Sequence, residues 1–303
     1  MSLLQGLRSS WRKNSPELLG FINGSLPAFV RRPGLGGELE GIPIYSYHVV
    51  DAELFEQDLR FLRRNQYVSL TLDELMDRIA GRAATGGREV VLTFDDGPRN
   101  FFDVAFPLLR EYGFRSTAFV APGLHAEHYG EFQDLTYRPM TWQELRSLHD
   151  SGLVSLQSHT LQSQYVPQWP APAPLAGVDP RIEARLRAPP LSLKDDFMQA
   201  RSLIEEQCPG AVVRHLCYPM YDSTPEAVRV AAEAGYVAGY GGLLPGRPVV
   251  RRGSEPGVLP RLSGEFLRRM PGEGRISLGQ LLRNRVSDAA RARKRRHLFG
   301  AAA

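Results

Sequence analysis

Short apolar runs alternate with helical patterns along most of the chain, beginning near residue 42. Thr71–Glu74 and Thr141–Glu144 each place a hydroxyl three residues before Glu, the pattern of a capping box at a helix start. Several apolar runs have too few polar positions for a half-exposed sheet, which indicates parallel strands covered by helices. We expect a closed or nearly closed β/α barrel, with a doubly wound open sheet as the alternative. The expected strands are Ile42–His48, Tyr67–Thr71, Glu89–Phe94, Ser116–Ala121, Leu153–Gln157, Val213–Tyr218 and Tyr236–Tyr240.

One proline-rich stretch interrupts the alternation. Tyr165–Leu193 contains seven prolines and few periodic apolar residues. Strand and helix patterns resume on both sides of it. We therefore expect a long loop inserted into one domain rather than a boundary between two domains.

The composition excludes several classes of protein. Hydrophobic residues make up 43% of the 303 positions, which is typical of a globular protein and not of a disordered or fibrous one. No run approaches the roughly 20 apolar residues that a membrane span needs. Leu18–Val30 is too interrupted for a signal peptide, and the two cysteines, Cys208 and Cys217, suit free thiols in a reducing compartment. We therefore expect a cytoplasmic protein.

The net charge of +4 conceals an uneven distribution. Residues 1–32 carry five basic residues and one acidic residue, and residues 283–303 carry seven and one, which leaves the segment between them acidic. The C-terminal basic residues alternate with apolar ones, as in an amphipathic helix on an anionic membrane surface; a solvated tail is the alternative. The tails have no aromatic interleaving and no reader motif, so we expect no specific nucleic-acid partner.

Two predicted strands end in residues that suit catalysis or metal binding. Val90–Pro98 runs from an apolar strand into Asp95, Asp96 and a Gly-Pro turn, and Leu156–Thr160 ends another strand at His159. Adjacent carboxylates repel each other, so a site that keeps both usually contains a cation, and imidazole with carboxylate suits Zn²⁺ or a similar ion. Taken singly, each segment also fits a capped turn or a surface histidine. Both strand ends would face the same mouth of a barrel, which favours a shared site.

Thr93–Pro98, followed by Ser158–Thr160, resembles the signature segments of the polysaccharide deacetylase family, carbohydrate esterase family four. The resemblance covers about residues 41–265 and implies a distorted (β/α)7 barrel. Leu259–Leu262 resembles the branch of the family that acts on poly-N-acetylglucosamine. Further matching segments are Pro43–His48, Phe106–Gly113, Ser116–Val120 and Arg214–Pro219.

The resemblance also implies a role for each matching residue. Asp95 resembles the general base, Arg214 the arginine that orients the base, and the Tyr218 amide the donor to the oxyanion. Asp96 and His159 resemble ligands of a divalent metal ion, for which Zn²⁺ is the expected choice. These roles imply metal-assisted hydrolysis of an amide.

Two positions depart from the family's pattern. Where the family has a second histidine, this chain has Ser163 and Gln164, and we expect the Gln164 carbonyl to occupy the third ligand position, more weakly than imidazole. The family's late general acid has no recognisable counterpart, because Arg261 occupies a comparable region and guanidinium is too basic to give up a proton. We expect His48 to act as the acid. The alternative acids are His125, His128 and His215.

These features predict a metal-dependent N-deacetylase that acts on an N-acetylated amino sugar, in a glycan or in a lipid-linked precursor met at the inner face of the membrane. The alternative is a degenerate barrel that binds a sugar or glycolipid without hydrolysing it. We divide the chain into a basic N-terminal extension at 1–40, a deacetylase-like barrel with its proline-rich insertion at 41–265, and a basic C-terminal tail at 266–303 that is helical in part.

Overall fold

The structure, a computed structural model, describes residues 20, 23, 25–32, 39–129, 136, 138–161, 191–221, 223–281 and 283–284. Gln164, nearly all of the proline-rich stretch and most of both basic tails, including the predicted amphipathic helix, lie outside these residues. Among the described residues, no helix is both long enough and apolar enough to cross a membrane.

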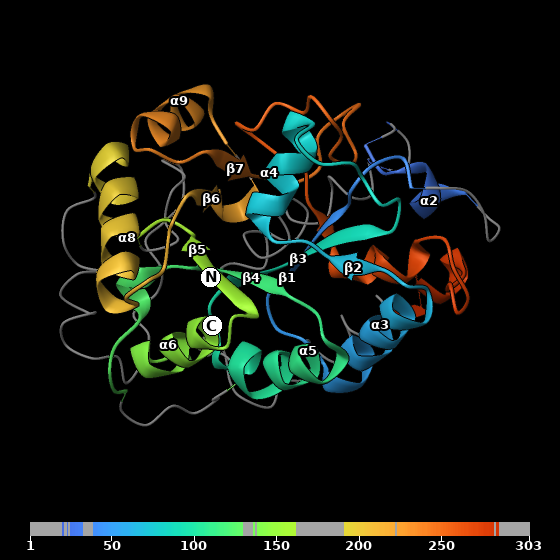
Figure 1. Ribbon diagram of the computed structural model, residues 1–303, viewed down its shortest axis with the longest axis horizontal. Helices are drawn as coiled ribbons and strands as arrows, with labels where there is room; N and C mark the ends of the chain where they lie inside the picture. Colours follow the sequence, from blue (N-terminus) through green and yellow to red (C-terminus); the bar gives the residue numbers. More distant parts are fainter. Residues whose placement is uncertain are drawn as a thin grey trace, which may run out of the picture.

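In the part of the chain that the structure describes, seven short parallel strands follow one another around a curled sheet (Figure 1), and their pairing closes it into a ring. The Leu259 amide donates to the Gly239 carbonyl of the seventh strand at 2.8 Å, and Leu262 and Ser263 pair with the first strand. Residues 259–263 therefore join the two ends of the sheet. The predicted distorted β/α barrel is confirmed, and the open-sheet alternative is wrong. In order around the ring the strands are β7 (Ala238–Tyr240), β6 (His215–Cys217), β5 (Val154–Ser158), β4 (Ser116–Val120), β3 (Glu89–Asp96), β1 (Ile44–Tyr47) and β8 (Leu262–Ser263), and β2 (Val68–Ser69) pairs with β3.

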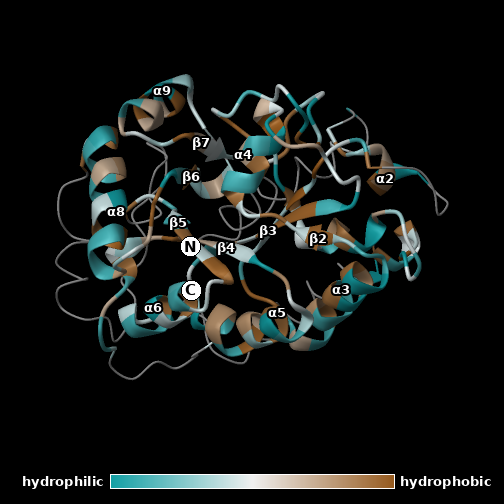
Figure 2. Cartoon of the chain, in the orientation of Figure 1, coloured by the Kyte–Doolittle hydropathy of each residue, from teal (hydrophilic) through white to brown (hydrophobic). Residues whose placement is uncertain are grey.

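Helices cover the outside of the ring and turn their polar residues to solvent (Figure 2). Two of them begin with the predicted capping boxes, at Thr71 and Thr141. The helices are α2 (Ala28–Arg31), α3 (Ala52–Arg64), α4 (Leu72–Ala80), α5 (Phe106–Tyr112), α6 (Trp142–Asp150), α8 (Leu193–Gln207) and α9 (Pro225–Glu233). Shorter turns are the π-helix η1 (Phe101–Ala105) and the 3-10 turns η2 (Pro122–Leu124), η3 (Pro219–Tyr221) and η4 (Gly264–Arg269).

The apolar core extends past both limits of the predicted domain at 41–265. Leu26 and Phe29, which precede it, and Phe266 and Met270, which follow it, are buried in the main core cluster. The two flanking segments also contact each other, α2 against η4. The predicted limits followed the extent of the family resemblance, whereas apolar side chains on both sides of those limits complete the core.

Candidate active site

Strand β3 delivers two adjacent carboxylates to the mouth of the barrel. The side chain of Asp95 is almost completely buried, whereas that of Asp96 is about half exposed, at 49%. Asp96 adopts φ +68°, a left-handed conformation that is rare for residues other than glycine and is concentrated at functional sites. Gly97 follows with the same φ, and a Cβ there would come within 2.8 Å of the His125 ring, so this turn requires glycine.

Asp95 is held by a buried arginine, Arg261. The guanidinium donates to both carboxylate oxygens of Asp95, at 2.7 and 2.8 Å, and also to the Thr93 hydroxyl and the Gly241 carbonyl. Burial alone would raise the pKa of Asp95, but Arg261 and the neighbouring histidines together hold it below its usual value. The Tyr221 ring lies 5.1 Å from the guanidinium carbon and covers the pair. The result is an ionised carboxylate in a fixed orientation.

His159 follows strand β5 directly and has one ring nitrogen directed at the carboxylates. Its Nδ1 lies 2.9 Å from the Cys217 carbonyl oxygen, which can only accept, so in the neutral ring Nδ1 carries the proton. Its Nε2 lies 3.3 Å from Asp96 Oδ1. Burial would lower the pKa of His159, but Cys217, Asp96 and Asp95 raise it well above its usual value. The surroundings of Nε2 therefore favour a positive charge, which a proton or a metal ion can supply.

His48 stands across the mouth from His159. Its Nε2 lies 3.9 Å from one carboxylate oxygen of Asp95 and 3.9 Å from one of Asp96, and its side chain is about one third exposed. Asn100 fixes the loop that carries it: the Asn100 amide accepts from the Val50 N–H at 2.7 Å and donates to the Val50 carbonyl at 3.1 Å. His48 is therefore held close to both carboxylates while it stays open to solvent.

These donors suit a divalent cation. In a tetrahedral site with bonds of about 2.1 Å, neighbouring nitrogen and oxygen ligands lie about 3.4 Å apart, close to the observed separation of His159 Nε2 and Asp96 Oδ1. The carbonyl that fixes the His159 tautomer is the kind of outer partner that metal-binding histidines normally have. Asp96 and His159 would hold the ion. A second set of ligand atoms, on Asp95, His159 and Cys217, lies within 4.8 Å of one another deeper in the barrel.

Arg214 does not orient Asp95, contrary to the sequence prediction. It immediately precedes β6 and so lies at the opposite end of that strand from the mouth, where it contacts Asp73 at 3.3 Å. Its side chain is 45% exposed, whereas that of Arg261 is completely buried. The sequence signal for Arg261 was its place in the Leu-Pro-Arg-Leu segment, which the prediction used as a mark of the poly-N-acetylglucosamine branch, while Arg261 itself was considered only as a possible acid and rejected.

The Tyr218 amide is also not the oxyanion donor. Its N–H already donates to the Tyr240 carbonyl at 2.9 Å, in register with the pairing of β6 and β7. The chain reaches the mouth two residues later, where Met220 and Tyr221 both adopt left-handed φ values, +56° and +63°. The sequence pattern indicated this turn but could not show which of its amides are already hydrogen-bonded within the sheet.

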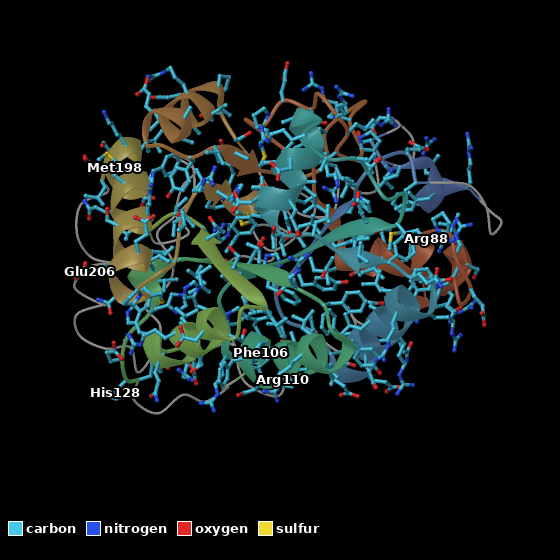
Figure 3. All side chains as sticks on the ribbon, viewed as in Figure 1. Arg88, Phe106, Arg110, His128, Met198 and Glu206 are labelled. Atoms are coloured by element: carbon cyan, nitrogen blue, oxygen red, sulfur yellow. The ribbon has the colours of Figure 1, made fainter. Side chains whose placement is uncertain are left out.

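The structure separates His48 from the alternative acids. His125 is buried, with Nδ1 2.7 Å from the Met140 carbonyl oxygen. His128 is exposed at the periphery of the molecule (Figure 3). His215 begins β6 at the end away from the mouth, next to Asp73. Gln164, the predicted third ligand, lies outside the described residues.

A family model and two curated relatives all relate this chain to polysaccharide deacetylases. The family model described as polysaccharide deacetylase matches residues 82–239. The poly-β-1,6-N-acetyl-D-glucosamine N-deacetylase of Escherichia coli K12 is 31% identical in an alignment of 145 positions that covers 41% of this chain and 21% of that protein. Its namesake from Staphylococcus epidermidis is 28% identical over 117 residues, 39% of this chain and 38% of that protein. The aligned part is thus well under half of each relative's length.

Two solved structures share the fold. IcaB from Ammonifex degensii superimposes with a TM-score of 0.59 at 22% identity, covering 78% of this chain and 97% of that one. A de-N-acetylase from Aggregatibacter actinomycetemcomitans gives a TM-score of 0.55 at 20% identity, covering 73% and 93%. At these identities the likeness supports the barrel and its strand order, and it assigns no residue a role.

Proposed function

The chain belongs to the polysaccharide deacetylase family, whose model matches more than half of it, and from this premise we propose that it hydrolyses the N-acetyl group of an amino sugar. The observation that carries the proposal is the buried Asp95–Arg261 pair, at 2.7 and 2.8 Å, with Asp96, His159 and His48 around the same mouth. A buried carboxylate kept ionised beside a solvent-accessible imidazole is the arrangement that general base and general acid catalysis requires.

The reaction divides between the two sides of the mouth. Asp95 accepts a proton from the water that attacks the acetyl carbonyl, and Arg261 keeps both oxygens of Asp95 in place while it does so. His48 then donates a proton to the departing sugar nitrogen, so acetate and a free amine are released. Asp96 and His159 would hold a divalent cation, for which Zn²⁺ is the first choice, and the chemistry of such an ion is Lewis-acid polarisation of the carbonyl oxygen.

The substrate class follows from the relatives. Two of them are named for poly-β-1,6-N-acetyl-D-glucosamine, and this chain has the fold of a solved de-N-acetylase. We extend this to an N-acetylglucosamine polymer or a lipid-linked precursor of one.

A cytoplasmic location, with the basic tails on an anionic membrane surface, is part of the same proposal. Deletion of residues 283–303 should then abolish co-sedimentation with anionic vesicles at low salt, and unchanged sedimentation would remove the membrane from the proposal.

The decisive test is hydrolysis with the metal controlled. The full chain, stripped by a chelator and reloaded with Zn²⁺, is incubated with β-1,6-linked N-acetylglucosamine oligomers and with a lipid-linked N-acetylglucosamine, and acetate is measured. We expect acetate from the reloaded protein and at least a ten-fold smaller rate from the stripped one. Sugar binding without acetate release from either substrate would favour the degenerate barrel instead.

A further inference from the structure

Cys217 brings a thiol to the buried side of the active site. It is the last residue of β6 and is completely buried. Its Sγ lies 3.8 Å from Asp95 Oδ2, and its carbonyl oxygen lies 2.9 Å from His159 Nδ1. One ligand atom from each of Asp95, His159 and Cys217 lies within 4.8 Å of the other two, the one such set of three among the described residues.

The spacing and type of these atoms suit a thiophilic metal ion. With bonds of about 2.3 Å to sulfur and 2.0 Å to oxygen, a tetrahedral Zn²⁺ site separates its sulfur and oxygen ligands by about 3.5 Å, close to the observed 3.8 Å. Thiolate is a soft ligand that selects Zn²⁺ and similar ions over the hard cations that carboxylates alone prefer. The set with Cys217 therefore differs in selectivity from the pair Asp96 and His159.

The charges also balance. Arg261 binds both oxygens of Asp95 from one side, and each carboxylate oxygen keeps a further lone pair. A metal ion deprotonates the thiol that binds it. Asp95 and the Cys217 thiolate would then carry two negative charges, and the half-exposed Asp96 beside them a third, against one positive charge on the guanidinium and two on the ion. In a buried site this neutrality matters, because an uncompensated charge is costly there.

The same set overlaps the residues that the reaction uses. His159 has a single nitrogen to offer, since Nδ1 is engaged by the Cys217 carbonyl, so an ion beside Cys217 and an ion on Asp96 cannot both bind it. An ion beside Cys217 would also occupy a lone pair of Asp95, the base. We propose that Asp95, His159 and Cys217 form a second cation position, selective for thiophilic divalent ions, which excludes the catalytic ion and blocks the base. The blocking rests on the proposed function; the binding does not.

Cadmium provides the test, because a thiolate bound to Cd²⁺ absorbs in the ultraviolet. The metal-free full chain is titrated with Cd²⁺ as wild type, Cys217→Ser, Cys217→Ala and Cys208→Ser. Cys208 is the matched control, a second buried free cysteine located at the end of α8. In the wild type and in Cys208→Ser, we expect the thiolate–Cd²⁺ absorption band to saturate at one Cd²⁺ ion per chain. Neither Cys217 variant should show the band. Removing a residue that only hydrogen-bonds to a metal ligand lowers metal affinity by roughly 10–100-fold. Cys217 would bind the ion directly, so the Cd²⁺ affinity of both Cys217 variants should fall by at least that factor.

A band that is absent from the wild type, or that persists in both folded Cys217 variants, overturns the proposal. Thermal unfolding with and without Cd²⁺ confirms that the variants are folded and supplies a second readout, since at equal concentration Cd²⁺ should raise the melting temperature of the wild type by more than that of the Cys217 variants, which keep only Asp96 and His159 as ligands. Inhibition of acetate release separates the two claims. A Cd²⁺ band in a chain that never releases acetate leaves the cation position standing and removes the deacetylase. If the active protein binds Cd²⁺ at Cys217 and still releases acetate at the same rate, the claim that this ion blocks Asp95 is wrong.

Discussion

Asp95 and Asp96 are neighbours in the sequence but have opposite surroundings. Asp95 is buried against a guanidinium, and Asp96 is half exposed beside an imidazole nitrogen. The alternation of a β-strand sends consecutive side chains to opposite faces, and the left-handed φ of Asp96 turns the second carboxylate back to the mouth. One residue is thus placed to exchange a proton and the other to bind a cation.

This difference predicts different failures for the two asparagine variants. Asp95→Asn should retain the metal and lose hydrolysis by about 10²–10⁴-fold, the usual contribution of a general base. Asp96→Asn should lose metal affinity, because a neutral amide replaces a charged ligand. Equilibrium dialysis against Zn²⁺ together with acetate release measures both. Equal metal loss in the two variants would contradict the separate roles.

Arg261 and Arg214 provide a second contrast between single residues. Arg261→Met leaves Asp95 buried without its counter-charge, so we expect the free energy of unfolding to fall by about 3–5 kcal/mol and hydrolysis to be lost. Arg261→Lys keeps the charge but loses the paired contact, and should lie between. Arg214→Met removes only an exposed contact with Asp73, for which we expect less than about 1 kcal/mol and near-normal activity. Urea unfolding measures the loss of stability in each variant, and acetate release measures the loss of activity. A larger loss in Arg214→Met than in Arg261→Met would restore Arg214 as the orienting residue.

At the level of elements, helix α8 fixes the segment that follows His159. The carboxylate of Asp196 on α8 accepts the Leu161 N–H at 2.9 Å, and the Leu161 carbonyl accepts the Gly123 N–H at 2.6 Å. Burial raises the pKa of Asp196 to about 6, against only a partial offset from the hydrogen bond. A helix on the outside of the barrel therefore positions a strand end through one titratable group.

The raised pKa gives the stability of this contact a definite pH dependence. Between about pH 4 and pH 6 the folded chain keeps the proton on Asp196 while the unfolded chain has lost it, so this group's contribution to stability falls as the pH rises through that range and is constant above it. Asp196→Asn cannot titrate, and its amide oxygen can still accept the Leu161 N–H. Relative to this variant, the wild-type melting temperature should fall between pH 4 and pH 6. Parallel melting curves across that range would contradict the assignment.

In the whole molecule, two arginines join the beginning of the described chain to its end. Arg269, almost completely buried, donates to the carbonyls of Val30, Arg32 and Ile276. Arg275 donates to the carbonyls of Phe29 and Arg32. The carbonyls of Phe29, Val30 and Arg32 belong to the short helix α2 and its C-cap, where the last carbonyls of a helix have no partner within the helix. Segments more than 230 residues apart in sequence are thereby fastened together.

Removing one of these arginines should loosen that junction without disturbing the mouth. In Arg269→Met several buried carbonyls lose their donor, so we expect at least about 2 kcal/mol of destabilisation and faster amide exchange in residues 28–32. Arg229→Met, which removes an exposed pair with Glu233 on α9, is the control and should change neither. Hydrogen exchange read by mass spectrometry resolves the two. Unchanged exchange in α2 would mean that its apolar contacts alone hold it.

The sequence by itself determined what depends on neighbouring residues. The capping boxes at Thr71 and Thr141, the alternation of strands and helices, and the strand ends carrying Asp95, Asp96 and His159 are local patterns, and the structure contains each of them. A barrel follows once strands alternate with helices, since parallel strands need such connections. Even the shared mouth could be inferred, because the carboxyl ends of parallel strands lie at one edge.

Only the tertiary structure decided which groups meet across the ring. Arg261 is 166 residues from Asp95, and it reaches that carboxylate because residues 259–263 close the barrel between β7 and β1. Arg214 and the Tyr218 amide failed as predictions for the same reason: strand direction places one at the far end, and strand register gives the other to Tyr240. The sequence determines the chemistry of each side chain. Its partner depends on the register of the strands and on the closure of the barrel, which a local sequence pattern does not predict.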